Sequence, residues 1–326
     1  MTVICELRTF DNISDDWDDV LLNSSNNNIF LTSTWQENWW QSLGIQDHKL
    51  MLIKISLDSF VIGIAPLVKH DGIVTFLGGT DVADVHDFVV RRGFEEPFYE
   101  ALTSYLDDQD WREIRLESLE ANSDTISSLE YWGQNTGYTV DKILEDELVG
   151  VTLPSTWDDY LEGLRKKDRH ELRRKFRKLE GEVDYHVEEL QSVMEISDSI
   201  EDFLSLMAQS RDEKAAFLTD DRVAFFRSMA LNMSIQGYLR LFFMVVNGTR
   251  TSAAVCFDYN NTLSLYNSGH DTSYSNLGTG FLLKATCLKT AIENGRNYYD
   301  MLRGSEPYKY HLGGVGRQLY RVSVYR

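Results

Sequence analysis

The chain has 326 residues, of which 43% are hydrophobic and 12% aromatic, with only 4 prolines, so intrinsic disorder and collagen-like architecture are excluded. Its formal net charge of −19 disfavours bulk attraction to nucleic acid or to an anionic membrane. Three widely spaced cysteines and the lack of a long apolar run lead us to expect a cytoplasmic protein with no membrane span.

The first half of the chain predicts a mixture of short strands and helices. Apolar, β-favouring runs separated by turns with Asp and Gly predict an antiparallel meander, followed by a helix and another strand. In chain order, we expect a strand at 3–7, helices at 15–23 and from 32–34 onward, strands at 50–56, 61–68 and 73–77, a helix at 97–106 and a strand at 113–119.

The second half repeats this order of elements. Strands are expected at 239–246, 251–259 and 263–266, a helix at 279–293 and a strand at 298–302. Residues 52–81 align with 242–271 at a constant offset of 190 without a gap. We therefore expect an α+β protein of two mixed-sheet domains, at 1–150 and 151–326. Because identities are few, chance similarity between two generic meanders is the alternative.

A basic helix is expected at 158–180. Nine Lys or Arg and two acidic residues lie between Arg165 and Lys178, so the remainder of the chain carries −26. Four arginines recur every fourth residue and would form one stripe, suited to a diphosphate, a nucleotide-linked sugar or an RNA backbone: Arg165, Arg169, Arg173 and Arg177. The alternative is a solvated face balanced by nearby glutamates.

Gly278, Thr279 and Gly280 lie between an expected strand and an expected helix. Glycines at a helix start let backbone amides approach an anion, and the helix dipole favours a phosphate there. Alternatively, Gly278 only shapes the turn and Thr279 caps the helix. The corresponding helix start in the first half carries Glu95 and Glu96, which would repel an anion, so any phosphate site is expected in the second half.

These elements resemble the GNAT acyltransferase fold, whose phosphate-binding pattern is Arg/Gln-x-x-Gly-x-Gly/Ala. The chain matches Gly278 and Gly280 but has Ser275 where Arg or Gln is usual. Over nearly its whole length it also resembles tandem-GNAT acyltransferases grouped with CelD-type cellulose-biosynthesis proteins, which in turn resemble Fem-type aminoacyl-transferases. The runs that carry this resemblance include TSTWQENWW, FLGGTDVADVHDF, SRDEKAAFL, LYNSGHD and YYDMLRGSEPYKYHLGG. The resemblance implies an acyl thioester donor and names no acceptor.

The segment from Asp300 to Tyr310 follows the last strand of the second meander and alternates charged with aromatic residues. Ligands of open α/β sheets bind where a strand ends beside a helix start. We therefore expect Glu306 to act as the catalytic base, Tyr310 as an acid, and Arg303 and Lys309 as substrate-binding cations. Lys214 is a further candidate contact for a phosphate or carboxylate, or else a surface lysine.

His86 and Asp87 belong to a polar loop after the first meander that also contains Asp81 and Asp84. A metal site is disfavoured because no second histidine is near. We expect His86 to bind the acceptor and Asp87 to transfer a proton. No metal cofactor is expected anywhere in the chain.

The leading hypothesis is transfer of an acyl group from acetyl-CoA or another acyl-CoA to an amine or hydroxyl of a small molecule or glycan precursor. Acyl groups other than aminoacyl are favoured. The first alternative is a Fem-like enzyme that uses aminoacyl-tRNA, with the arginine stripe contacting RNA. The second alternative is a non-catalytic binding module of polysaccharide assembly, which the departure at Ser275 favours. The sequence does not indicate an oligomeric state.

Overall fold

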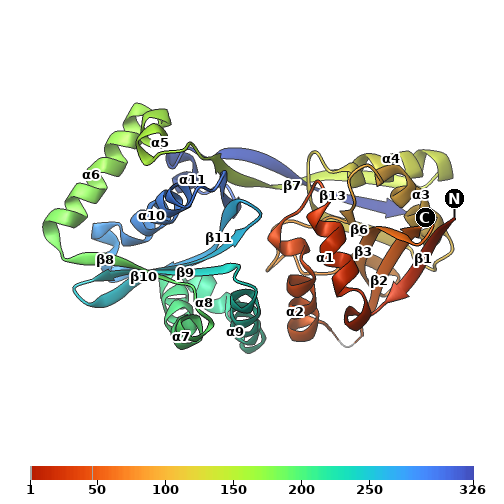
Figure 1. Ribbon diagram of the computed structural model, residues 1–326, viewed down its shortest axis with the longest axis horizontal. Helices are drawn as coiled ribbons and strands as arrows, with labels where there is room; N and C mark the ends of the chain where they lie inside the picture. Colours follow the sequence, from red (N-terminus) through yellow and green to blue (C-terminus); the bar gives the residue numbers. More distant parts are fainter. Residues whose placement is uncertain (1, 46) are drawn as a thin grey trace. The chain divides into compact units, whose positions relative to one another are not determined.

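The helices and strands fall into two units (Figure 1). The structure is a computed structural model that describes residues 2–45 and 47–326. Unit 1 comprises residues 1–147 and 317–326, and unit 2 comprises residues 148–316. The expected α+β class is confirmed, because both units combine a mixed sheet with helices.

Unit 1 contains the first meander. Strands β2, β3 and β4 are antiparallel, and β4 pairs in parallel with β6. Helices α3 and α4 share a buried core with this sheet. The elements are β1 (Val3–Arg8), η1 (Phe10–Asn12), α1 (Ser14–Leu22), η2 (Ile29–Leu31), α2 (Ser33–Leu43), β2 (Lys49–Leu57), β3 (Phe60–His70), β4 (Ile73–Phe76), β5 (Val89–Val90), α3 (Glu95–Asp107), β6 (Glu113–Glu120), α4 (Asp124–Thr136) and β7 (Thr139–Thr152).

Unit 2 repeats this topology, with β9, β10 and β11 antiparallel and β11 parallel to β12. Helices α7 to α9 cover one face of the sheet and α10 the other (Figure 1). The elements of the second half of the chain are α5 (Trp157–Gly163), α6 (Lys166–Glu182), β8 (Tyr185–Leu190), α7 (Val193–Ser210), α8 (Asp212–Phe217), α9 (Asp220–Ile235), β9 (Leu239–Val246), β10 (Thr249–Tyr259), β11 (Thr262–His270), η3 (Thr272–Leu277), α10 (Thr279–Glu293), β12 (Tyr298–Arg303), α11 (Pro307–His311) and β13 (Val315–Tyr325), most of which belongs to unit 1.

The turns of the two meanders also correspond. Each hairpin closes with two residues of positive φ, which is the conformation that matches the twist of tight two-residue hairpins. Positions 58–59 and 71–72 in unit 1 correspond to 247–248 and 260–261 in unit 2. Ser118 in β6 and Leu302 in β12 share a further positive φ, of 63° and 58°. This shared backbone detail supports an internal duplication more strongly than the few sequence identities do.

The sequence did not predict how the last strands pair. Strand β13 pairs with β6 in unit 1, whereas the C-terminal part of β7 pairs with β12 in unit 2. Each half of the chain therefore contributes its last strand to the sheet begun by the other half.

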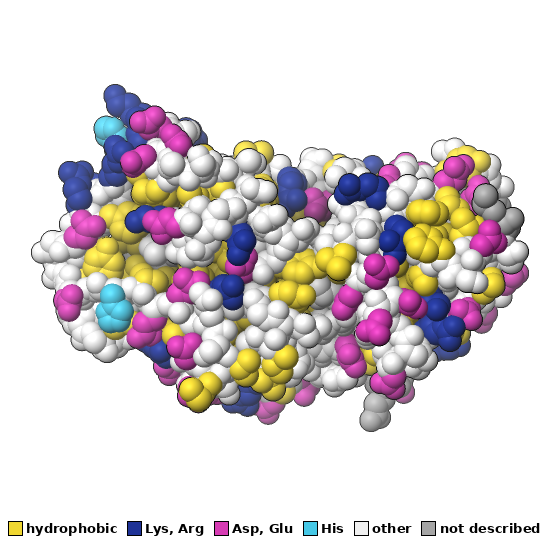
Figure 2. Space-filling model, viewed as in Figure 1, with side chains coloured by type: hydrophobic (Ala, Val, Ile, Leu, Met, Phe, Trp, Pro, Cys, Tyr) yellow, Lys and Arg dark blue, Asp and Glu magenta, His cyan; other side chains and the backbone are white. Residues whose placement is uncertain are grey.

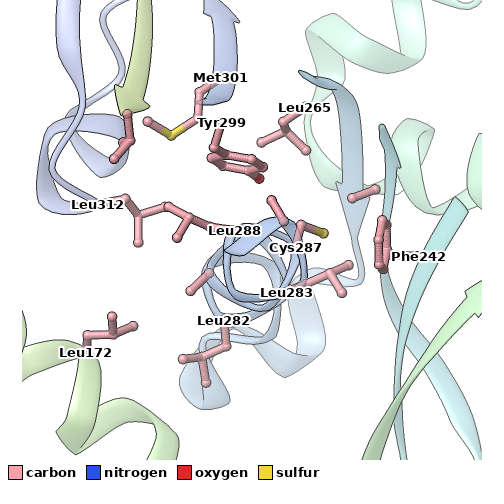
Figure 3. Packing of buried hydrophobic residues seen from close by; sticks show 14 of the residues in the cluster. Leu172, Phe242, Leu265, Leu282, Leu283, Cys287, Leu288, Tyr299, Met301 and Leu312 are labelled. Atoms are coloured by element: carbon pink, nitrogen blue, oxygen red, sulfur yellow. The ribbon is translucent and has the colours of Figure 1, made fainter. Parts of the chain in front are cut away.

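Helix α10 forms the centre of the unit 2 core. Figure 3 shows Leu282, Leu283, Cys287 and Leu288 projecting from different sides of this helix into buried surroundings. Apolar residues on several sides of a helix are typical of an element that packs within a core. Because α10 is packed from several directions, the position of its N-terminus, where the glycines lie, is set by the core.

The expected helix at 158–180 is wrong in one respect, because two helices occupy this segment. Helix α5 ends at Gly163 and α6 begins at Lys166, with Leu164 and Arg165 in non-helical conformations. Leu164 is buried in the core, and the Arg165 guanidinium binds the Asp168 carboxylate at 2.6 Å in the first turn of α6. These contacts stabilise the break, which the helical spacing of the leucines did not reveal.

Candidate functional site

The glycine turn at the start of α10 has the features of an anion-binding helix start. Gly278 is the N-cap residue of α10, with φ of 70°. As a glycine it has no side chain that could cap the helix. A Cβ at Gly280 would lie 3.2 Å from Cγ of His270, so only glycine leaves this approach open. Thr279 is 1% exposed. The turn thus presents backbone rather than side chains at the positive end of the helix dipole.

Two lysines of α6 lie beside this turn. The Lys178 ammonium donates to the carbonyl oxygen of Asn276 at 2.7 Å, and the Lys175 nitrogen lies 3.8 Å from the Cβ position of Gly278. The Ser275 hydroxyl, at the position where the GNAT pattern has Arg or Gln, donates to the Thr272 carbonyl instead. The cations at the turn therefore come from a separate helix.

The strands next to the turn separate. The parallel pairs between β11 and β12 run from Thr262–Tyr298 to Ser264–Asp300, while β11 continues to His270 along β10. Tyr266 is an extra residue in β11, because Leu265 and Asn267 pair with adjacent residues of β10. Such a bulge bends a strand and redirects its side chains. The two strands therefore diverge beyond Ser264 and Asp300, ahead of the glycine turn, and we call this divergence the slot.

A cluster of cations lies around this slot. The Lys214 ammonium donates to the Asn267 side-chain oxygen at 2.8 Å and to the Ser268 carbonyl. Burial and the neighbouring charges of Lys284 and Arg211 lower the pKa of Lys214 to about 8. The pKa of Lys284 is also lowered to about 8, chiefly by burial, and its ammonium donates to the Gly280 carbonyl at 3.2 Å.

His270 ends β11 and contacts the glycine turn. Burial and the charges of Lys284, Lys214 and Arg211 lower its pKa below the ordinary value of 6.5. The imidazole is therefore neutral at pH 7 and has a ring nitrogen that can accept a proton. Sequence reasoning missed His270, although its position at the end of a strand just before the glycines was a usable signal.

Glu306 lies in the same region and is half-buried at the start of α11, and its role as the catalytic base stays a prediction. Burial alone would raise its pKa, but Lys309 and Arg211 outweigh this effect and hold it below the ordinary value. Glu306 is thus an ionised carboxylate among cations. Its charge in turn raises the pKa of Lys214 and of Lys284, which links these groups electrostatically.

The expected substrate-binding role of Lys309 is not supported by its surroundings. This lysine is 1% exposed, and its ammonium donates to the carbonyl oxygens of Leu302, Arg303 and Gly304 at 3.0, 2.6 and 2.9 Å. It also pairs with Glu306 at 3.0 Å. An ammonium has three protons to donate, so none is left for a ligand. Lys309 instead holds the loop after β12 in place.

Arg303 and Tyr310 flank this loop, and both are partly exposed. Tyr310 packs against the unit 2 core. Between them in sequence lies Tyr308, whose ring faces the Lys284 ammonium at 5.0 Å and whose pKa is raised by burial. Glu306 and two tyrosines thus belong to one short loop, and the buried Lys309 binds the backbone of that loop.

The basic stripe on α6 is not one surface. Arg169 donates to the Leu161 and Glu162 carbonyls at the end of α5, so it serves as a helix cap and not as the expected substrate contact. Arg173 remains exposed and lines a cavity described below. The four-residue spacing could not show which of the arginines would donate hydrogen bonds to the C-terminal carbonyls of α5.

His86 and Asp87 lie in unit 1 and are buried. The His86 ring is 1% exposed and stacks on Phe76 at 5.8 Å, which does not fit the expected contact with an acceptor. The Asp87 carboxylate accepts hydrogen bonds from the Thr125 and Ser123 hydroxyls and from the Phe88 amide. These contacts fix the start of α4 and favour a structural role over proton transfer.

The variant Asp87→Asn distinguishes a structural role of this carboxylate from a role in proton transfer. Burial raises the pKa of Asp87 above 3.8 more than its hydrogen bonds lower it, so the folded protein binds this proton more tightly than the unfolded chain does. The free energy of unfolding of the wild type is therefore expected to fall, relative to that of Asp87→Asn, as the pH rises above about 4.

Urea denaturation between pH 4 and pH 7 measures this difference. Asp141→Asn, which removes an exposed carboxylate of the same unit, should show no comparable pH dependence. A loss of turnover of ~100-fold or more in Asp87→Asn, without a change in stability, would instead identify a general base.

Solved structures share this fold over almost the whole chain. The crystal structure of FemX is 13% identical, with a TM-score of 0.68, and the match covers 97% of this chain and 96% of that chain. A conserved protein of unknown function from Bacteroides thetaiotaomicron is 12% identical, with a TM-score of 0.62 and full coverage of both chains. A tandem GNAT protein from the clavulanic acid biosynthesis pathway is 10% identical, with a TM-score of 0.51 and 98% coverage of both.

Residues 166–310 match the family model described as "Acetyltransferase (GNAT) domain". The chain therefore contains a GNAT acyltransferase domain, and the matched residues include the glycine turn, the slot and the cation cluster. No curated protein matches the chain. Across residues 2–45 and 47–326, no helix is long and apolar enough to cross a membrane, and no group of three acidic, His or Cys side chains is placed to hold a metal ion.

Proposed function

We propose that the protein transfers an acyl group from an acyl-CoA, such as acetyl-CoA, to an amine or hydroxyl acceptor, with the reaction in unit 2. The observation that carries this proposal is the divergence of β11 and β12 directly before the glycine turn. A slot between strands admits an extended thioester arm, and the uncapped amides at the start of α10 bind its diphosphate. Metal ions are not required for this reaction.

The donor diphosphate would lie at Gly278, Thr279 and Gly280. The backbone amides and the helix dipole supply part of the attraction, and Lys175 and Lys178 supply positive charge. Under this proposal, the presence of Ser275 in place of the usual Arg or Gln is compatible with catalysis, because Lys175 and Lys178 of α6 supply positive charge at the turn.

The acceptor would enter beside Glu306 and the cation cluster. Its nitrogen or oxygen attacks the thioester carbonyl carbon, the carbon–sulfur bond breaks, and the thiolate leaves and takes up a proton. Glu306 or the neutral His270 accepts the proton of the acceptor, and Tyr310 is the candidate donor to the thiolate. Arg303 and Lys214 are the candidate contacts for a charged acceptor, such as a glycan precursor.

An aminoacyl-tRNA donor is the second candidate. The exposed cations Lys166, Lys167 and Arg173 on α6 favour it, because an RNA backbone contacts more phosphates than coenzyme A does. Retention of tRNA that weakens steeply with salt, together with no protection by coenzyme A, would favour this reading over the first.

The double variant Lys175→Gln/Lys178→Gln tests the donor assignment. Loss of two charged contacts at the turn is expected to weaken binding of coenzyme A by about 10- to 100-fold, as measured by isothermal titration calorimetry. The matched control is Lys166→Gln/Lys167→Gln, which removes the same charge from the first turn of the same helix. Equal weakening in both variants would mean that the turn is not the donor site.

A further inference from the structure

A second cavity in unit 2 has no part in the proposed acyl transfer. It has a volume of about 850 Å³, is open to solvent and is lined by residues of α5, α6, β8 and α10. On the face drawn in Figure 2, hydrophobic side chains gather between α6 and β8, and Lys and Arg side chains lie along α6 above them. The cavity thus combines an apolar surface with a cationic one on a chain whose net charge is −19.

The inner wall of the cavity is largely aliphatic and aromatic. Leu161 and Leu172 are buried in the unit 2 core, and Trp157, Phe176 and Val187 are partly buried against it. These side chains come from α5, α6 and β8. The aliphatic part of this wall, together with the aromatic rings of Trp157, Phe176 and Tyr185, offers an apolar surface on which a hydrocarbon chain can be buried.

The rim of the cavity is cationic. Four cations line it, Arg173, Arg174, Arg177 and Lys289, against the single carboxylate of Glu180. Arg174 is paired with Glu171 at 2.8 Å, and Lys289 with Glu293 at 3.6 Å. Arg177 donates only to the Arg173 carbonyl, and Arg173 makes no ion pair within the described residues. Two guanidinium groups are therefore available for an anion at the mouth of an apolar cavity.

We propose that this cavity binds one anionic lipid, with its phosphate at Arg173 and Arg177 and an alkyl chain against the apolar wall. Guanidinium groups bind phosphate oxygens in a fork geometry, and apolar burial adds free energy in proportion to the area covered. Both surfaces are needed for tight binding of such a ligand. Contacts between the exposed arginines and a phosphate are weakened by salt, and a neutral hydrocarbon would leave the rim cations without a partner.

The lipid site is distinct from the donor site. Arg173 and Arg177 lie on one side of the buried Leu172–Leu179 face of α6, and Lys175 and Lys178 lie on the other side, at the glycine turn. A lipid in the cavity therefore need not displace an acyl-CoA at the glycine turn. The lipid-binding proposal and the acyl-transfer proposal can thus be tested, and can fail, independently.

Titration with dodecyl phosphate, kept below its aggregation concentration, tests the proposal. We expect it to bind at least 10-fold more tightly than inorganic phosphate, which lacks the chain, and than dodecyl maltoside, which lacks the charge. Co-flotation with vesicles of phosphatidylcholine and phosphatidylglycerol, but not with pure phosphatidylcholine, is the expected result for a lipid in a bilayer. Dodecyl phosphate binding without such flotation would overturn the lipid assignment.

Variants locate the site. Thr286→Phe fills the cavity from α10 and should weaken dodecyl phosphate binding at least 10-fold, as should Arg173→Gln/Arg177→Gln. Lys166→Gln/Lys167→Gln removes equal charge from α6 outside the cavity and should bind as the wild type does. Gly280→Asp should also bind normally. Unchanged binding in Thr286→Phe with an unchanged melting temperature, or loss of binding in Gly280→Asp, would overturn the assignment.

Discussion

Gly280→Asp is expected to weaken binding of coenzyme A by ~100-fold or more while the protein stays folded. The new carboxylate would stand at the site proposed for the donor diphosphate, and its Cβ would press on the His270 ring, 3.2 Å away. An acidic residue in the first turn of a helix interacts favourably with the helix dipole, and Asp has a higher helix propensity than glycine. The free energy of unfolding should therefore change by no more than ~1 kcal/mol.

Three controls make this experiment specific. Gly163→Asp adds the same charge in the same unit, at a glycine with open space around it, and should bind coenzyme A normally. Glu95→Gln at the start of α3 should also leave binding unchanged, because that helix start belongs to unit 1. Gly280→Ala adds the Cβ without the charge and should give an intermediate loss. Equal effects at Gly280 and Gly163 would contradict the donor assignment.

Lys309→Met is expected to destabilise the protein by ~3–5 kcal/mol, as measured by urea denaturation. The substitution keeps most of the side-chain volume but leaves the carbonyl oxygens of Leu302, Arg303 and Gly304 without their buried donor. It also leaves Glu306 without its ion pair. The chain passes through left-handed conformations at Leu302 and Gly304, with φ of 58° and 103°, so the loop depends on this ammonium to hold its shape.

Two variants help to interpret this loss. Lys167→Met removes an exposed lysine from α6 and should change stability by less than ~0.5 kcal/mol. Combining Lys309→Met with Glu306→Gln should recover part of the lost stability, because the neutral amide no longer needs a cation. If Lys309→Met instead kept the stability of the wild type and lost only ligand affinity, the sequence-based assignment of Lys309 to substrate binding would be correct.

The meanders and the glycine turn could be predicted from the sequence because their signals are local. Hairpin turns follow from Asp, Asn and Gly between β-favouring runs, and Gly278 with Gly280 before an apolar helix predicts an exposed helix start. Such patterns depend on residues within about ten positions of one another. For the same reason, Glu306 could be placed near the site, since it follows directly from the end of β12.

The partners of these local features were decided by the tertiary structure. The cations beside the glycine turn come from α6, about a hundred residues earlier in the chain. Lys309, Asp87 and Arg169 carry the residue types expected of a site, yet buried carbonyls, hydroxyls and a helix end satisfy them. The pairing of β13 with β6, and of β7 with β12, likewise has no local pattern. A charged side chain is free to bind a ligand only when no backbone group in the fold needs it, and that depends on contacts that the order of residues along the chain does not contain.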